Sequence, residues 1–246
     1  MSAQVIAISN QKGGVGKTTT VVNLAGFCAL AGKRTLVIDN DPQGNASSVL
    51  GEGMDERSVY SGLAPAATKT DNLSLIAAGH DLHDCERALA KADSGRQTLR
   101  GILQPLRERF EIIFIDCPPN LTVLPVNALL AADHLILPLQ CEYFAMEGMA
   151  QLLAFTDDLR LKSGATIDLL GILLTMYSAD QPLSRQIEQD IRSHFPTKTF
   201  ATTIPRDLAL AAAPSHGQTI AAYDPLCAGE VAYLAATKEL LQGLKK

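Results

Sequence analysis

The chain has 246 residues, of which 47% are apolar and 19% are charged, and its formal net charge is −5. This length suffices for one large α/β domain, with two small domains as the alternative. The acidic balance argues against a surface that is basic throughout. No stretch approaches the roughly 18 consecutive apolar residues of a membrane span. The first strand pattern begins almost at once, without a leader, so we expect a cytoplasmic protein.

The five cysteines are odd in number, scattered and without a C-x-x-C pair. This usage argues against a disulfide framework and against a zinc or iron–sulfur site. Isolated cysteines of this kind are usually small buried hydrophobic residues.

Apolar runs alternate with helical patterns along the whole chain. Strands are predicted at residues 5–9, 35–38, 73–77, 111–115, 134–138, 169–174 and 199–204. Helices are predicted at residues 18–30, 81–91, 95–109, 124–131, 146–162, 183–194, 207–212 and 228–244, with short helices and loops over 42–72. Continuous Val/Ile/Leu runs between helices indicate a mostly parallel sheet covered on both faces. We therefore expect a single α/β domain over residues 1–246.

The first strand leads into a glycine-rich loop, residues 11–20, and then into a helix. Strand, loop and helix form the setting of a phosphate-binding loop, because glycines let backbone N–H groups turn towards an anion at the positive end of the helix dipole. The usual G-x-x-x-x-G-K-[ST] pattern fails because Gln11 occupies its first glycine position, and the loop instead reads K-G-G-V-G-K-T-T. The predicted phosphate-binding residues are Lys12, Gly13, Gly14, Val15, Gly16, Lys17, Thr18 and Thr19, with Lys17 on the β- and γ-phosphates and Thr18 on Mg²⁺.

Acidic residues follow two of the predicted strands. Asp39 and Asp41 come after the strand at 35–38, and Asp116 ends an apolar run in a Walker B pattern. Ligands of open α/β sheets bind at the carboxyl ends of the strands, where a carboxylate can hold Mg²⁺ or position an attacking water. The alternative for Asp39 and Asp41 is that they only cap a loop.

The loop with its second lysine at Lys12 resembles the deviant Walker A loop of the ParA/MinD group of ATPases. The stretches at residues 39–45, 140–148, 171–177, 204–207, 213–217 and 223–225 resemble ParA proteins of the Soj type, so the resemblance covers about residues 4–240. It implies a P-loop NTPase fold, ATP and Mg²⁺ as cofactors, and a homodimer that sandwiches ATP, with Lys12 reaching the partner's phosphates.

The resemblance also assigns individual roles. It implies that Asp41 orients the hydrolytic water and that Asp39 belongs to the metal shell together with Thr18 and Asp116. It places Met176, Pro205 and Asp207 around the adenine. For these last three residues, ordinary packing and turn chemistry is the alternative.

DNA binding in this family uses basic residues of the C-terminal half, since Lys and Arg contacts to phosphate supply non-specific affinity. Several basic positions of the family are replaced here, among them Ala209, Gln218 and Leu226. Candidates that remain are Arg185, Arg192 and Arg206. Arg185 and Arg192 are seven residues apart on one predicted helix face, and a solvated face is their alternative interpretation.

The resemblance implies an ATPase that partitions a plasmid or chromosome origin, binds DNA non-specifically in its ATP state, and is stimulated by a ParB-like partner. The missing basic residues favour an alternative in which the same ATPase positions a protein cargo, such as a carboxysome or chemotaxis cluster, through an adaptor. A MinD-like membrane-surface ATPase would need an amphipathic C-terminal tail, whereas the last predicted helix suits packing against the domain. A metabolic enzyme or iron–sulfur reductase on this scaffold is a further alternative, although the cysteine spacing supports no cluster.

Overall fold

A seven-stranded sheet forms the centre of the computed structural model, which describes residues 2–92, 95–143 and 145–245. One position of the motif at 140–148, residue 144, lies outside the described residues. The strand order is β3-β4-β2-β5-β1-β6-β7, and all neighbouring pairs are parallel except β3 with β4. The strands are β1 (Gln4–Ile8), β2 (Thr35–Asp39), β3 (Ala66–Ala67), β4 (Leu73–Ile76), β5 (Ile112–Asp116), β6 (His134–Gln140) and β7 (Asp168–Thr175). The expected mostly parallel sheet is confirmed.

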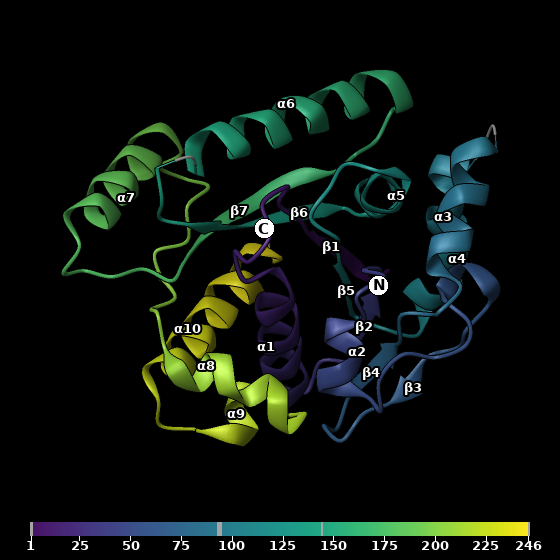
Figure 1. The fold of residues 1–246 in the computed structure, drawn as a ribbon, viewed down its shortest axis with the longest axis horizontal. Helices are drawn as coiled ribbons and strands as arrows, with labels where there is room; N and C mark the ends of the chain where they lie inside the picture. Colours follow the sequence, from purple (N-terminus) through teal and green to yellow (C-terminus); the bar gives the residue numbers. More distant parts are fainter. Residues whose placement is uncertain (1, 93–94, 144, 246) are drawn as a thin grey trace.

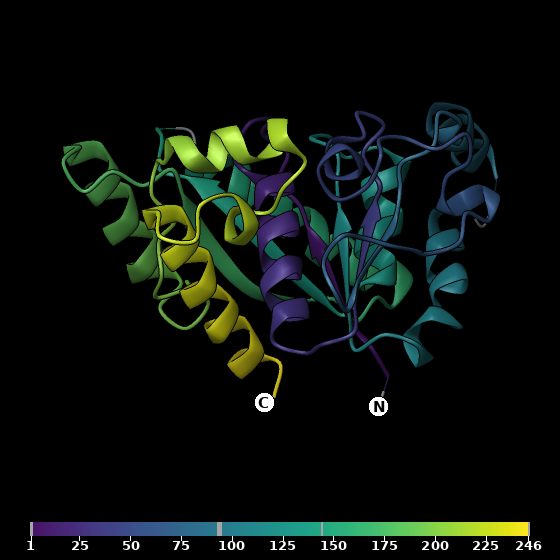
Figure 2. The same ribbon diagram turned by 90° about the horizontal axis from the view of Figure 1, so that it is seen from below.

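Helices cover both faces of this sheet (Figures 1 and 2). The α-helices are α1 (Lys17–Leu30), α2 (Asn45–Leu50), α3 (Leu82–Lys91), α4 (Thr98–Leu103), α5 (Val123–Ala131), α6 (Ala145–Ser163), α7 (Pro182–His194), α8 (Leu208–Ala212), α9 (Ile220–Tyr223) and α10 (Ala228–Gly243). Short 3-10 turns lie at Val59–Ser61, Gly95–Gln97, Leu106–Glu108 and Ala213–His216. Within the described ranges, none of the helices has the length and apolarity that a bilayer span requires.

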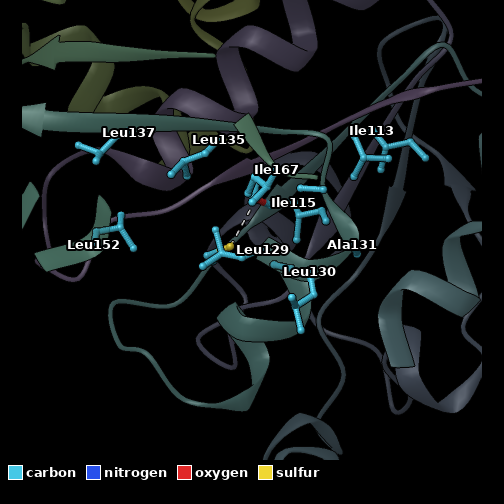
Figure 3. Close-up of a cluster of buried hydrophobic side chains, with 14 of the residues drawn as sticks. Ile113, Ile115, Leu129, Leu130, Ala131, Leu135, Leu137, Leu152 and Ile167 are labelled. Atoms are coloured by element: carbon cyan, nitrogen blue, oxygen red, sulfur yellow. Dashed lines mark hydrogen bonds between the residues drawn. The ribbon is translucent and has the colours of Figure 1, made fainter. Parts of the chain in front are cut away.

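The two faces of the sheet form separate hydrophobic clusters. Ile113 and Ile115 of β5 point into the cluster under α4, α5 and α6 (Figure 3), whereas Ile112 and Phe114 pack with α1, α8 and α10. Successive side chains of a strand point to opposite faces, so the unbroken apolar run of β5 fills both clusters. The strand is buried on both faces and paired with β1 and β2, so its last residue, Asp116, lies at the sheet edge between the ends of these two strands.

The strand predicted at residues 199–204 is wrong. This segment runs beside β7 and forms only isolated bridges, at Thr199 and, just beyond β7, at Pro205, although Phe200 N and Ile204 N donate to the β7 carbonyls of Ile172 and Leu174 at 3.0 and 2.8 Å. Between them, the backbone N–H groups of Ala201 and Thr202 donate to the Glu239 carboxylate of α10, at 2.7 and 2.8 Å. A side chain thus takes the hydrogen bonds that a strand ladder would need.

The helix predicted at 95–109 is also wrong as one element, because the structure divides it into two 3-10 turns and α4. The break lies at Pro105, which has no N–H to donate to the preceding turn. Gln104 N bonds Gly101 O in a tightened last turn, after which a new turn begins. Proline therefore separates two pieces whose apolar periodicity is nearly continuous.

Candidate active site

The loop between β1 and α1 lies at the carboxyl edge of the sheet, where β1 is flanked by β5 and β6. In the strand register, Asp116 is the partner of Ile8 on one side and of Asp39 on the other. The ends of β1, β2 and β5 therefore bring the glycine loop and two acidic residues to one place. Parallel strands explain this convergence, because their carboxyl ends meet at a single edge.

Two glycines give the loop its shape. Gly14 and Gly16 have φ of 74° and 86°, in the left-handed region that glycine adopts without steric cost. Thr175 at the end of β7 fixes the loop from outside, since its hydroxyl donates to Val15 O at 2.9 Å. Helix α1 follows with no side-chain cap from the described residues, so its first N–H groups face the loop and favour an anion.

Both lysines of the loop have partners inside the chain. Lys17 is buried, and its Nζ donates to Lys12 O at 2.9 Å. Burial lowers the pKa of Lys17, and the attraction of Asp116 and other nearby groups opposes this only in part. The Lys12 ammonium forms an ion pair with Glu142, just beyond β6, and both side chains are about half exposed. Each predicted lysine therefore has a partner within the chain, one a backbone carbonyl and the other a carboxylate.

The two acidic residues of the neighbouring strands differ in their surroundings. Asp39 accepts hydrogen bonds from Ser47 N at 2.7 Å, from Ser47 Oγ at 2.6 Å and from Asp41 N at 3.2 Å. Burial raises its pKa to about 6, although these hydrogen bonds favour the charged form. Asp116 is completely buried, and within the described residues neither of its carboxylate oxygens accepts a hydrogen bond of good geometry, although the Thr18 side chain and the Lys17 charge lie close enough to favour its charged form. Burial, followed by repulsion from Asp39, raises the pKa of Asp116 well above its usual range.

A divalent cation would fit this arrangement. Buried carboxylate oxygens without partners call for an explanation, and Mg²⁺ is often held by one or two carboxylates together with water and substrate phosphates. Among the described residues, no cluster of three or more His, Cys, Asp or Glu side chains could enclose a metal. The residues present therefore suit a shared site completed by Thr18 and phosphate oxygens better than an all-protein cage.

Asp41 lies in the turn between β2 and α2. Its Oδ1 accepts from Gln43 N at 2.9 Å, and its carbonyl accepts from Gly44 N at 2.9 Å. Gly44 has φ of 64°, so glycine suits the residue that ends this turn. The loop-capping role considered from the sequence is therefore present, and the Asp41 side chain is buried beside the other two acidic residues.

The three residues predicted around the adenine line one pocket of about 280 Å³, together with Gly16 and Thr19. Met176 has φ of 49°, a strained value for a side chain of its size. The Asp207 carboxylate already accepts from Ala209 N and from Gly229 N, both at 2.8 Å, so it caps α8 and joins it to α10. The pocket lies next to the glycine loop, because Gly16 and Thr19 also line it. The Asp207 hydrogen bonds also fit the alternative considered from the sequence, in which Asp207 serves only the local turn.

The three candidate DNA-binding arginines differ in how far their guanidinium groups are engaged by hydrogen bonds within the chain. The guanidinium of Arg192 is engaged by Glu188 and by the carbonyl oxygens of Phe200 and Ala201, at 2.9, 2.9 and 3.1 Å. Arg185, which lies on the same helix as Arg192, donates a hydrogen bond to the carbonyl oxygen of Ala179, before the start of α7. Arg206 is exposed and lines the pocket beside Asp207. Arg192 therefore serves the packing of α7 on the segment after it.

Two residues near the site were not singled out from the sequence. Glu142 lies within the motif at 140–148, so the match of this motif to the family could have pointed to Glu142. Ser47 lies in the region 42–72, which the sequence predicts only as short helices and loops. Its contact with Asp39 joins residues eight positions apart, and no local pattern indicates such a contact.

Comparison with known proteins supports one family over nearly the whole chain. A family model described as an AAA domain matches residues 3–169. The chain is 42% identical to the chromosome partitioning protein ParA of Caulobacter vibrioides over 250 residues, covering 97% of this chain and 94% of that protein. It is 42% identical to the sporulation initiation inhibitor protein Soj of Bacillus subtilis over 247 residues, covering 96% and 98%.

A solved structure agrees with these relatives. The cobyrinic acid a,c-diamide synthase of Mycobacterium smegmatis with bound ADP and magnesium superimposes with a TM-score of 0.84 at 32% identity, covering 99% of this chain and 96% of that one. The matching sequences, the shared fold and the glycine loop with its flanking acidic residues agree with one another. The chain belongs to the ParA/Soj family of P-loop ATPases.

Proposed function

We propose that this protein is an ATP-dependent dimerising ATPase that segregates DNA, a plasmid or a chromosome origin. The observation that carries the proposal is the meeting of the K-G-G-V-G-K-T-T loop with the completely buried Asp116 carboxylate at one sheet edge. Relatives named for chromosome partitioning support the DNA cargo. In this proposal residues 1–246 act as one ATPase domain.

Each candidate residue then has a role. Residues 12–19 surround the phosphates, and Lys17 exchanges its bond with Lys12 O for the β- and γ-phosphates. Thr18 and Asp116 hold Mg²⁺, with Asp39 in the surrounding shell. When bound, Mg²⁺ supplies charge neutralisation at the phosphates. Asp41 orients the attacking water, and Met176, Pro205 and Asp207 form the adenine pocket.

Dimerisation gives Lys12 its role in this proposal. The half-exposed ammonium leaves Glu142 and reaches the phosphates of the partner subunit, so that two nucleotides lie between two chains. An exposed ion pair of this kind contributes at most about 1 kcal/mol, so exchange for a phosphate contact is favourable. The dimer binds non-specific DNA of the nucleoid in the cytoplasm, through Arg185 and Arg206, and a ParB-like protein stimulates hydrolysis.

One observation favours a second candidate function. Arg192 is occupied inside the chain, and several other family positions carry no basic residue. Fewer phosphate contacts mean weaker DNA binding. The same ATPase would then position a protein cargo through an adaptor, on a surface other than DNA.

The Asp41→Ala variant tests the proposal, because slow hydrolysis keeps the ATP-bound state populated. We expect ATP–Mg²⁺ to convert it to a dimer in light scattering, and the dimer to bind random-sequence duplex DNA with an affinity that falls steeply with salt. Dimerisation without DNA binding at low salt would favour the cargo alternative. A monomer under all conditions would contradict the proposed dimer.

A further inference from the structure

Asp41 lies in the loop formed by residues 39–47, and Ser47, at the end of this loop, bonds Asp39 at its beginning. Asp39 ends β2, and Ser47 lies in the first turn of α2. Both the backbone N–H and the hydroxyl of Ser47 donate to the same Asp39 oxygen, Oδ2, at 2.7 and 2.6 Å. These two bonds join the ends of the segment 39–47.

The Ser47 hydroxyl also ties this loop to the next strand. Its oxygen accepts from Ala78 N at 2.8 Å, just after β4, and β4 is the neighbour of β2 in the sheet. Ser47 is completely buried. One hydroxyl therefore uses its donor on Asp39 and its acceptor on Ala78, so its orientation is fixed from both sides.

Asp41 lies within this loop and is held in place by hydrogen bonds of its backbone and side chain. Its N–H donates to Asp39 Oδ1, the oxygen that Ser47 leaves available, and its carbonyl and carboxylate are held by the turn that follows. Rotation of the Asp39 carboxylate would therefore move the backbone of Asp41. Since Ser47 supplies two of the three hydrogen bonds on that carboxylate, it limits the rotation.

We infer that Ser47 is a positioning residue for hydrolysis: by clamping Asp39 to the end of β4, it fixes the loop on which Asp41 approaches the γ-phosphate. The inference rests on the proposed function, because it takes Asp41 as the residue that orients water. It also assigns Asp39 a second role as the anchor of this loop. Small displacements of an orienting group cost large factors in rate, whereas nucleotide binding depends on the separate loop at 12–19.

The chain supplies a matched control in the next residue. Ser48 lies on the same helix and is exposed, and within the described part of the chain its hydroxyl donates only to the Gly44 carbonyl of its own turn, at 3.0 Å. Ser47→Ala and Ser48→Ala thus remove the same atom from adjacent positions. Only the first removes contacts with Asp39 and Ala78.

The test measures kcat and KM for ATP, the affinity for a fluorescent ATP analogue, and amide hydrogen exchange without nucleotide. For Ser47→Ala we expect kcat to fall about 10- to 100-fold, the range found for residues that support an active-site group, with KM and analogue affinity unchanged. Exchange at Gln43 and Gly44 should rise, while exchange in β5 stays the same. Ser48→Ala should match the wild type, and Ser47→Thr, which keeps the hydroxyl, should recover most of kcat.

The possible failures are distinguishable. Equal kcat in Ser47→Ala and Ser48→Ala overturns the inference, as does a fall in kcat accompanied by faster exchange throughout the sheet. If Ser47→Ala does not fold, Ser47→Cys, a weak donor of nearly the same size, must give an intermediate kcat. A wild type that neither binds the analogue nor hydrolyses ATP overturns the proposed function itself, and the inference with it.

Discussion

The phosphate side of the site, built by β1, β2 and β5, differs from the side built by β7, α7 and α8. On the phosphate side, among the described residues, no hydrogen bond of good geometry reaches the buried Asp116 carboxylate, and the one hydrogen bond of the Lys17 ammonium goes to a backbone carbonyl. On the other side, the charged groups of Asp207 and Arg192 are engaged by backbone atoms of their own chain. The charges of Lys17 and Asp116 are therefore more available to a ligand, whereas those of Asp207 and Arg192 hold segments of the fold together.

The largest test of this contrast is Lys17→Ala, which removes the phosphate contact of the loop. Loss of two charge-assisted hydrogen bonds should weaken ATP binding by about 100-fold or more, measured by titration with a fluorescent ATP analogue. Lys33→Ala is the control, because Lys33 pairs with Glu111 beyond the opposite end of α1. Wild-type ATP affinity in Lys17→Ala would refute the assignment of the loop.

Arg192→Ala tests the other side. It removes three hydrogen bonds, including two to backbone carbonyls, and we expect the free energy of unfolding to fall by about 2 kcal/mol, measured with urea. Arg185→Ala, with one contact on the same helix, should change it by less than about 0.5 kcal/mol. If Arg192→Ala keeps its stability but loses DNA binding, the contrast between the two sides is wrong.

Asp116→Asn should stabilise the nucleotide-free protein by about 1 kcal/mol at pH 7, because burial and repulsion from Asp39 outweigh the stabilisation that Lys17 and Thr18 give to this buried carboxylate. The folded-state pKa of Asp116 is raised above its ordinary value of 3.8. The folded wild type therefore holds its proton more tightly than the unfolded chain, and its stability falls as pH rises above about 4.

The difference between Asp116→Asn and wild type should thus shrink as pH falls towards 4. Urea unfolding at pH 4 and pH 7, with and without Mg²⁺–ATP, measures it. Because Mg²⁺ would compensate the charge, the ligand should stabilise the wild type more than the variant. A variant less stable than the wild type at pH 7 would show that Lys17 and Thr18 stabilise the Asp116 carboxylate more than its burial costs.

The smallest expected effect concerns Met176. Met176→Gly relieves a left-handed conformation worth about 1 kcal/mol, but it also removes a side chain from the pocket beside the loop. We expect slightly higher stability together with a KM for ATP raised a few-fold. Asn72→Gly is the control, since Asn72 also has positive φ, at 62°, and contributes no side chain to the pocket. An unchanged KM in Met176→Gly would leave that pocket without a role in ATP binding.

The sequence predicts best where chemistry and local geometry coincide. The glycine loop, the run ending at Asp116 and the parallel sheet are all local patterns, and the structure has them in the expected places. The segment 199–204 also has a strand-like pattern, yet Glu239 of a distant helix takes the hydrogen bonds of Ala201 N and Thr202 N in its middle. Ser47 and the engagement of Arg192 likewise depend on contacts between separated segments. Such contacts leave no periodicity, so only the structure reveals them.

The internal bonds of the glycine loop have a consequence for how tightly it holds nucleotide. Lys17 already bonds Lys12 O, and the Lys12 ammonium already pairs with Glu142. With the proposed roles, nucleotide binding exchanges the Lys17 bond, and dimerisation exchanges the Lys12 pair, for contacts to phosphate. The net free energy of each step is then the difference between two sets of contacts, and each lysine regains its internal partner when the product leaves. Such an exchange keeps nucleotide binding from becoming too tight for repeated turnover.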